Sequence, residues 1–425
     1  MGQSSRQRDP RLITILLIVF VQFVGASMAL PILPLLARRA FELPDAQITP
    51  LLASFFAAQF IAGPFIGRLS DQYGRIPVLI VSQVGTVISF LMLVFAQSVP
   101  LLYASRILDG ITGGNVVVAQ AYITDITPRE RRTQSLGLLF AAFGVGFIVG
   151  PALGGVLSAL MGPRAPFLVA ALAASIVVIM TWRNLDESLS AEQSAANRTR
   201  SKNSLSPGQV LTNMPLLSVL GIAFVAQFGL GLVQATFSLY GDEVLFAGQP
   251  QRVTDLGIGG LLAMVGVGQV ITQTLLLDRM LKRFSEAWLI VIGDLIRGLS
   301  LFILAVVVSP LPAGVSLLLF ALGSGLLVPS LQTMITNTVD DAYRGGALGL
   351  FQSINSLAII FSTFFGGRIY EVQTALPYYL GAGLSIAAAV PALLLVRWVR
   401  LNPDVQTGSE QDDDYPEQSQ TAPAD

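Results

Sequence analysis

The sequence contains neither cysteine nor histidine among its 425 residues. The absence of cysteine excludes disulfides, thiolate metal sites and cysteine nucleophiles, and the absence of histidine removes the commonest metal ligand and general base. Charged residues make up only 12% of the chain, about half of the roughly 25% found in soluble domains. The formal net charge of −1 offers no basic surface for nucleic acid. No G-x-x-x-x-G-K-[ST] loop is present either, so an ATP-driven pump is excluded.

Apolar residues dominate instead, at 53% of the chain, and the mean hydropathy is +0.68. Apolar stretches near the ~20 residues that cross a bilayer as a helix recur along the sequence, without the period-two alternation of a membrane β-barrel. We therefore predict an all-α membrane protein with twelve transmembrane helices. The predicted spans are 12–36, 48–69, 77–97, 100–124, 134–160, 166–184, 215–239, 257–277, 287–308, 312–336, 346–368 and 377–398.

The positions of the Lys and Arg residues predict how these spans are oriented. Most of the 25 basic residues fall in loops on one side if both termini are placed on that side, and cytoplasmic loops carry the excess of positive charge. We expect a multi-pass protein of the bacterial cytoplasmic (inner) membrane with both termini in the cytoplasm. The first apolar run has no small-residue cleavage site, so it is read as a retained helix.

A polar stretch divides six spans from six. We predict a first six-helix bundle at 1–184, a flexible cytoplasmic linker at 185–214, a second bundle at 215–400 and a disordered acidic tail at 401–425. The tail has a solubilising role as its simplest explanation.

The two halves also repeat each other. The segment from Arg132 to Leu138 matches the segment from Arg344 to Leu350, and the same offset carries Gly154-Gly155 onto Gly366-Gly367. Duplicated bundles place a binding site between the halves near the midplane and suit alternating access. A packing solution shared by the two halves is the alternative explanation.

The loop between the second and third spans contains Gly67, Asp71, Gly74 and Arg75. The glycines permit sharp turns and close approach, and the aspartate can meet unpaired amides at a neighbouring helix N-terminus. The sequence G-R-L-S-D-Q-Y-G-R resembles the G-x-L-x-D-x-x-G-R loop of the major facilitator superfamily. That resemblance implies a gate in which Asp71 latches onto the start of the eleventh span, near Arg344; a loop that only fixes topology is the alternative.

The fifth span contains a glycine ridge, formed by Gly146, Gly150, Gly154 and Gly155, with Pro151 inside it. Glycines four residues apart give a flat face for close helix packing, and the proline bends the helix. The segment resembles the G-x-x-x-G-P-x-x-G-G motif that the family's antiporters carry, especially the twelve- and fourteen-helix drug exporters. We expect the glycine-rich eighth span as its partner; ordinary small-residue packing is the alternative. The stretch from Ala121 to Arg132 resembles drug exporters that include the tetracycline exporters.

Four charged residues fall well inside the predicted spans, away from their ends. Arg106 and Asp109 lie three residues apart in the fourth span, and Asp294 and Arg297 repeat this spacing in the ninth with the signs reversed. Burial favours a neutral acid whereas a nearby cation favours the carboxylate, and a proton-binding switch requires such competition. The fourth span also resembles the family motif L-x-x-x-R-x-x-x-G, whose arginine is implicated in proton coupling. Static ion pairs that join helices are the alternative for both pairs.

Uncharged polar residues within the spans are candidates for the wall of a substrate cavity, because lipid would penalise them. The candidates are Gln22, Gln59, Asn115, Gln120, Gln227, Gln234, Gln269 and Asn355. Several related exporters carry an acidic residue where Gln22 stands, and glutamine cannot carry a proton. Because the chain contains no histidine, any proton carrier must be Asp or Glu.

Taken together, the sequence predicts a secondary transporter that exports drugs or small amphiphilic compounds in exchange for protons. The alternative is an exporter or uniporter of a small metabolite such as a sugar, an amino acid or a siderophore. We expect a monomer in the lipid bilayer, with a small-molecule substrate, no cofactor, no metal, no nucleic acid and no enzymatic activity.

Overall fold

The computed structural model describes residues 10–113, 115–128, 131–188, 207–339 and 343–401, and within these ranges the regular structure is entirely helical. The first half contains α1 (Pro10–Phe41), α2 (Asp45–Tyr73), α3 (Arg75–Val94), α4 (Val99–Thr112), α5 (Asn115–Ile126), α6 (Arg132–Met161) and α7 (Ala165–Asn184). The second half contains α9 (Pro207–Thr212), α10 (Met214–Tyr240), η2 (Gly241–Leu245), α11 (Gln251–Ile271), η3 (Thr272–Leu276), α12 (Leu277–Leu281), α13 (Glu286–Val306), α14 (Pro310–Asn337), α15 (Arg344–Val372) and α16 (Leu376–Leu401).

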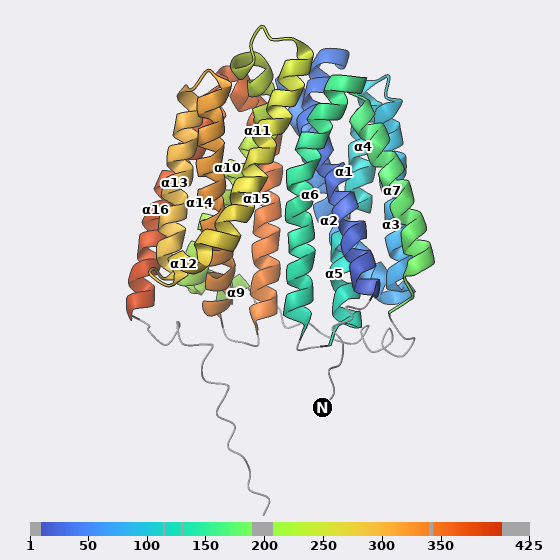
Figure 1. The fold of residues 1–425 in the computed structure, drawn as a ribbon. Coiled ribbons are helices and arrows are strands. Elements are labelled where there is room, and N and C mark those ends of the chain that lie inside the picture. Colours follow the sequence, from blue (N-terminus) through green and yellow to red (C-terminus); the bar gives the residue numbers. More distant parts are fainter. Residues whose placement is uncertain (1–9, 114, 129–130, 189–206, 340–342, 402–425) are drawn as a thin grey trace, which may run out of the picture.

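Eleven helices in the described ranges are long and apolar enough to cross a membrane. The predicted fourth span, 100–124, is not one helix, which corrects the sequence prediction. It consists of α4 and α5, which follow one another between the two faces of the molecule (Figure 1), so that the described ranges make twelve crossings. α4 ends where two glycines follow each other, and glycine is a poor helix former. The amide of Gly113 donates to the carbonyl of Gly110, a short i to i+3 bond that tightens the end of α4.

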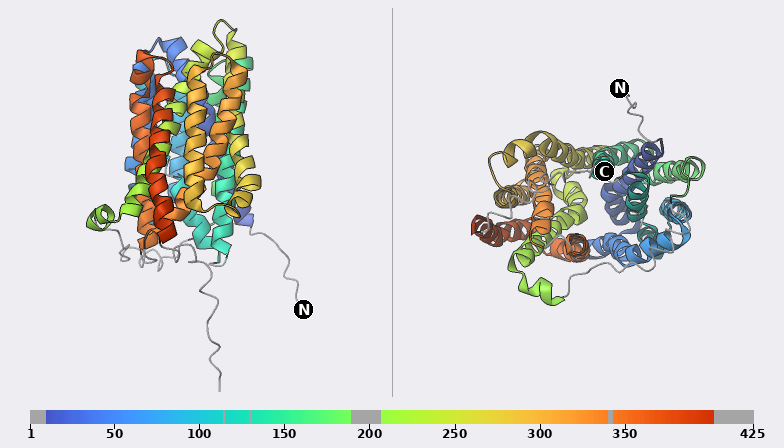
Figure 2. Two further views of the ribbon diagram at one scale, coloured as in Figure 1. Left: turned by 90° about the vertical axis from the view of Figure 1, so that its left-hand side faces the viewer. Right: turned by 90° about the horizontal axis from the view of Figure 1, so that it is seen from below.

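The crossings form two six-helix bundles that lie side by side (Figure 2), which confirms the predicted fold class. We call the face at which α1 begins and α16 ends the lower face, as drawn in Figure 1, and the other the upper face. The main contacts between the bundles join α6 to α11 and α2 to α15. These are the fifth with the eighth and the second with the eleventh crossings, as a six-crossing repeat requires.

The apolar core changes along the height of the molecule. Near the upper face one continuous cluster joins both bundles, with Leu33 and Ile48 of the first half and Phe237 and Ile258 of the second among its members. Towards the lower face the core divides into two clusters, one formed by the first half and one by the second. The bundles are thus packed together at the top and packed separately below.

Candidate functional site

The upper face is closed by ion pairs that cross between the bundles. Arg38, near the end of α1, binds Asp45 of its own bundle at 2.6 Å and Glu243 of the other at 3.2 Å. Arg39 binds Asp242 at 2.6 Å. Backbone contacts support the closure, since the amide of Gly367 on α15 donates to Thr49 Oγ1 on α2 at 2.8 Å.

Asp255 is the most buried acid of this upper cluster, with 1% of its surface exposed. One of its oxygens accepts from Arg39 Nη1 at 2.8 Å, and the other accepts from Ser158 Oγ at 2.6 Å. Because Arg39 lies on α1, Ser158 on α6 and Asp255 on α11, the carboxylate holds three helices from both bundles together.

The antiporter-type ridge on α6 packs against two different helices. Gly146, Gly150 and Gly154 face α1, where a β-carbon on Gly150 would lie 2.8 Å from the carbonyl oxygen of Val24. These three glycines therefore serve packing within the first bundle. The sequence prediction that the ridge packs on the eighth crossing is wrong for them.

The prediction is right for the other edge of the ridge, which faces α11. A β-carbon on Gly155 would lie 2.6 Å from the carbonyl oxygen of Asp255, and one on Gly259 would lie 2.6 Å from that of Pro151. The second half repeats this close contact between the bundles, because Gly367 on α15 approaches the Asp45 backbone of α2 in the same manner. Small residues are thus required at both of these helix contacts between the bundles.

On the lower face, the predicted gating loop is built around Arg75. The Arg75 side chain is 6% exposed and binds Asp71 at 2.6 Å and Asp125 of α5 at 3.0 Å. Gly74 has a φ of +99°, a conformation that favours glycine, and it separates α2 from α3. The latch between Asp71 and the start of α15 stays a prediction.

Gly67, the first glycine of the loop motif, has a different environment. A β-carbon there would lie 3.8 Å from Val117 Cγ1, which is an ordinary packing distance. Close helix approach is therefore not what Gly67 provides in this arrangement.

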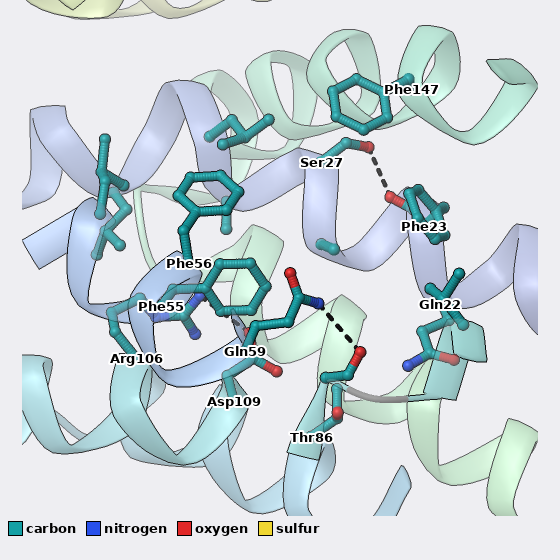
Figure 3. Close-up of a pocket in the computed structure, with 17 residues that line it drawn as sticks. Gln22, Phe23, Ser27, Phe55, Phe56, Gln59, Thr86, Arg106, Asp109 and Phe147 are labelled. Carbon is teal, nitrogen blue, oxygen red and sulfur yellow. Dashed lines mark hydrogen bonds and ion pairs between the residues drawn. The ribbon is translucent and has the colours of Figure 1, made fainter. Parts of the chain in front are cut away.

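A cavity of about 170 Å³ opens among the helices of the first bundle. Figure 3 shows its aromatic wall, to which Phe23, Phe55, Phe56 and Phe147 contribute. Its polar lining consists of Gln22, Ser27, Gln59, Thr86, Arg106 and Asp109. An apolar pocket with a few convergent polar groups is the usual form of a small-molecule site.

The two charged residues of the cavity are paired with each other. Arg106 Nη1 donates to Asp109 Oδ2 at 3.1 Å, and Arg106 Nη2 donates to Ser89 Oγ of α3 at 3.1 Å. Both residues are at most 5% exposed. The pair predicted from the i, i+3 spacing is therefore formed, and it places a carboxylate on the wall of the pocket.

Gly110 lets α4 approach α2, since a β-carbon there would lie 2.7 Å from Ala58 Cβ.

The second pair, on α13, is arranged differently. Arg297 donates to the carbonyl oxygen of Ala226 on α10 and lies 4.8 Å from the ring centre of Phe320 on α14. Asp294 is fully buried, and both of its carboxyl oxygens lack a hydrogen-bond partner among the described residues. Arg297 thus joins three helices of the second bundle without forming the ion pair that the repeated spacing implied.

The remaining polar candidates do not gather in this cavity. Of the eight candidates, Gln22 and Gln59 line the cavity. All of the residues that line it come from the first bundle. Gln120 is half-buried on α5, and the side chain of Asn115 lies outside the described part of the chain. Gln227, Gln234, Gln269 and Asn355 belong to the second bundle, where Gln234 Oε1 and Asn355 Oδ1 are buried without a described hydrogen-bond partner.

Sequence reasoning missed the closure of the upper face. A signal was available: Arg38 and Arg39 are adjacent on the side where basic residues are otherwise scarce, and Asp242 and Glu243 follow the seventh crossing. It also missed Phe23 and Phe147 in the cavity, because a phenylalanine in an apolar helix carries no pattern that separates pocket from packing.

Comparison with known proteins agrees with this architecture. The family model of the Major Facilitator Superfamily matches residues 15–249 and 237–422. The tetracycline resistance protein of class C from Escherichia coli is 32% identical over 395 residues, which cover 92% of this chain and 98% of that protein. Multidrug resistance protein 2 of Bacillus subtilis is 28% identical over 381 residues, which cover 89% of this chain and 93% of that protein.

Solved structures show the same fold at low sequence identity. A bacterial homologue of the human lysosomal transporter Spinster, in an inward-facing and unoccupied conformation, aligns with a TM-score of 0.70 at 18% identity and covers 95% of this chain and 98% of its own. The peptide transporter POT aligns with a TM-score of 0.76 at 14% identity, and the alignment covers 95% of this chain and 97% of the transporter's. Since the family model matches both halves, this multi-pass membrane protein belongs to the Major Facilitator Superfamily.

Proposed function

We propose that this protein is a secondary transporter that exports drugs or other small amphiphilic compounds in exchange for protons. The single observation that carries the proposal is the cavity, whose aromatic wall lies beside one buried ion pair. Aromatic walls take up planar apolar surfaces, and a few polar groups orient the ligand. Relatives named for tetracycline and multidrug resistance support this substrate class.

Alternating access gives the two faces different roles. The ion pairs of Arg38 and Arg39 close the upper face, and the apolar core is divided between the bundles near the lower face. At the lower ends of α6 and α15, a β-carbon on Gly137 or Gly349 would meet no atom of another element within 4 Å among the residues that the structure describes. We infer a state open towards the lower face. We propose that this is the cytoplasmic face, because cytoplasmic loops carry the excess of basic residues.

The proton step is proposed for Asp109. Its carboxylate lies on the cavity wall and is neutralised by Arg106. A proton and a cationic ligand would each neutralise this carboxylate in place of Arg106, so that proton and drug compete for one site. Asp294 is the second candidate, because it is buried within the second bundle and both of its carboxyl oxygens lack a hydrogen-bond partner among the described residues.

Transport in everted membrane vesicles tests the proposal. Vesicles that contain the protein should accumulate cationic dyes or tetracyclines when a pH gradient is imposed, and should stop when the gradient is collapsed. Vesicles without the protein are the control. Accumulation of neither class, with uptake of a sugar, amino acid or siderophore instead, would replace this function with metabolite transport. We further propose that the functional unit is a monomer.

A further inference from the structure

The segment that connects the two bundles is anchored at its start. Leu185 is only 5% exposed, the hydroxyl of Tyr122 donates to the carbonyl oxygen of Asp186 at 3.0 Å, and Ser188 Oγ donates to Asp125 Oδ2 at 3.2 Å. A flexible linker was expected over 185–214. Its first four residues instead lie against the gating loop, and residues 189–206 lie outside the described ranges.

Glu187 is the main contact of this segment, because it caps α3. The amide groups of Arg75 and Ile76 donate to Glu187 Oε1 and Oε2 at 2.9 and 3.1 Å. The first amides of a helix have no partner within the helix, and Gly74, which precedes α3, has no side chain to serve as a cap. Pro77 has no N–H group, so the carboxylate of Glu187 accounts for the free donors at the first two positions of α3.

The same arginine takes part in the cap and in the gate. The Arg75 backbone is held by Glu187, while its side chain binds Asp71 and Asp125. Asp125 Oδ2 also accepts from Ser188, the residue after Glu187. α2, α3, α5 and the start of the connecting segment therefore share one network of hydrogen bonds.

Gly74 adds a steric requirement to this network. A β-carbon at position 74 would lie 2.9 Å from Glu187 Cδ, which is closer than real contacts allow. The glycine thus makes room for the carboxylate, in addition to adopting a positive φ.

We propose that Glu187 is a positioning residue for the gate. It holds the first turn of α3, and through it Arg75, in register with Asp71 and Asp125, so that the segment joining the bundles controls the geometry of the loop that opens and closes between them. This inference rests on the proposed alternating access. The role of Glu187 is distinct from substrate binding, because Arg75 lies eleven residues from Thr86 of the cavity, or about 16 Å along the helix.

Amide hydrogen exchange on the full-length protein in lipid nanodiscs tests the cap directly. In the Glu187→Ala variant, exchange at the amides of Arg75 and Ile76 should become roughly tenfold faster, as for loss of a hydrogen bond to a charged group. Asp186→Asn is the matched control. It removes the same charge one residue away but leaves the backbone carbonyl that Tyr122 uses, so its exchange should equal that of the wild type.

Transport measurements complete the test. Glu187→Ala should lower the maximal transport rate several-fold and leave the substrate KM unchanged, and Glu187→Gln, which keeps one acceptor oxygen, should fall between it and the wild type. Equal exchange in Glu187→Ala and Asp186→Asn would overturn the proposal, as would a change confined to KM. If the wild type transports none of the probes, the proposed function fails, but the exchange result still decides whether the cap exists.

Discussion

Arg39 and Asp255 are 216 residues apart in the sequence, yet the guanidinium of one donates to the carboxylate of the other at 2.8 Å across the two bundles. The pair lies above the cavity and is supported by Ser158 and Asp242. Opening of the upper face must break it, because the two residues belong to bundles that separate there. Its strength therefore helps set how often the upper face opens.

Asp255→Asn should weaken this closure. The loss of a charged hydrogen bond of this kind costs roughly 1–3 kcal/mol, so the upper-open state should become about tenfold more populated. The sequence contains no cysteine, so a Leu30→Cys substitution on the cavity wall introduces a single reactive thiol. Its rate of labelling by an impermeant maleimide added at the upper face measures how often that face opens. Arg164→Gln is the control, since Arg164 binds the carbonyl of Ala96 within one bundle; equal labelling of the two variants would refute the closure.

Replacing Asp109 by Asn should abolish the dependence of drug transport on the pH gradient. The substitution also leaves Arg106 buried without its partner, which is itself destabilising by several kcal/mol. The double variant Arg106→Gln with Asp109→Asn removes this unpaired charge and should recover thermal stability without recovering coupling. A double variant that still follows the pH gradient would move the proton step to Asp294, which Asp294→Asn then tests.

Gly150→Leu should prevent α6 from packing on α1, because a β-carbon there already meets Val24 and Ser27. We expect a lower Tm in detergent and loss of transport. Gly137→Leu on the same helix is the matched control, since no described residue of another helix lies within 4 Å of its β-carbon position, and it should fold as the wild type does. Similar Tm values for the two variants would argue against the tight packing of the ridge.

Gly323→Ala should destabilise the second bundle. The added methyl group would lie 2.7 Å from Arg297 Cγ and 2.7 Å from the Gly293 carbonyl oxygen, and such overpacking typically costs roughly 1–3 kcal/mol. Gly383→Ala, at an open position of α16, controls for the change of residue type. A Tm that falls equally in both would argue against the close packing of Gly323 on α13.

Hydropathy and motifs were sufficient to predict the fold and its two-bundle plan, because lipid requires long apolar helices. They were not sufficient to predict helix ends. The first span was predicted to end at residue 36, but α1 runs to Phe41, since Arg38 and Arg39 find acidic partners there. Hydropathy reports what a residue prefers alone, not which partner the fold supplies.

The site was predicted less completely than the fold. Arg106, Asp109, Gln22 and Gln59 were identified because charge and amide groups inside a span need a reason. Glu187 was not, because a carboxylate in a polar segment has no distinguishing pattern until Gly74 and the start of α3 are placed beside it. The spacing of Asp294 and Arg297 predicted an ion pair. In the structure, Arg297 instead donates to a backbone carbonyl oxygen of α10.

At the end of α4, Gln59 Nε2 donates to the carbonyl oxygen of Gly113, and both residues line the cavity. The oxygen belongs to the main chain, so no amino-acid replacement at position 113 deletes it. A compound that displaces the Gln59 amide and donates its own hydrogen bond to this oxygen would bind to a feature that mutations can shift but cannot remove. Variation in what the protein recognises should therefore accumulate in the phenylalanines that line the same cavity.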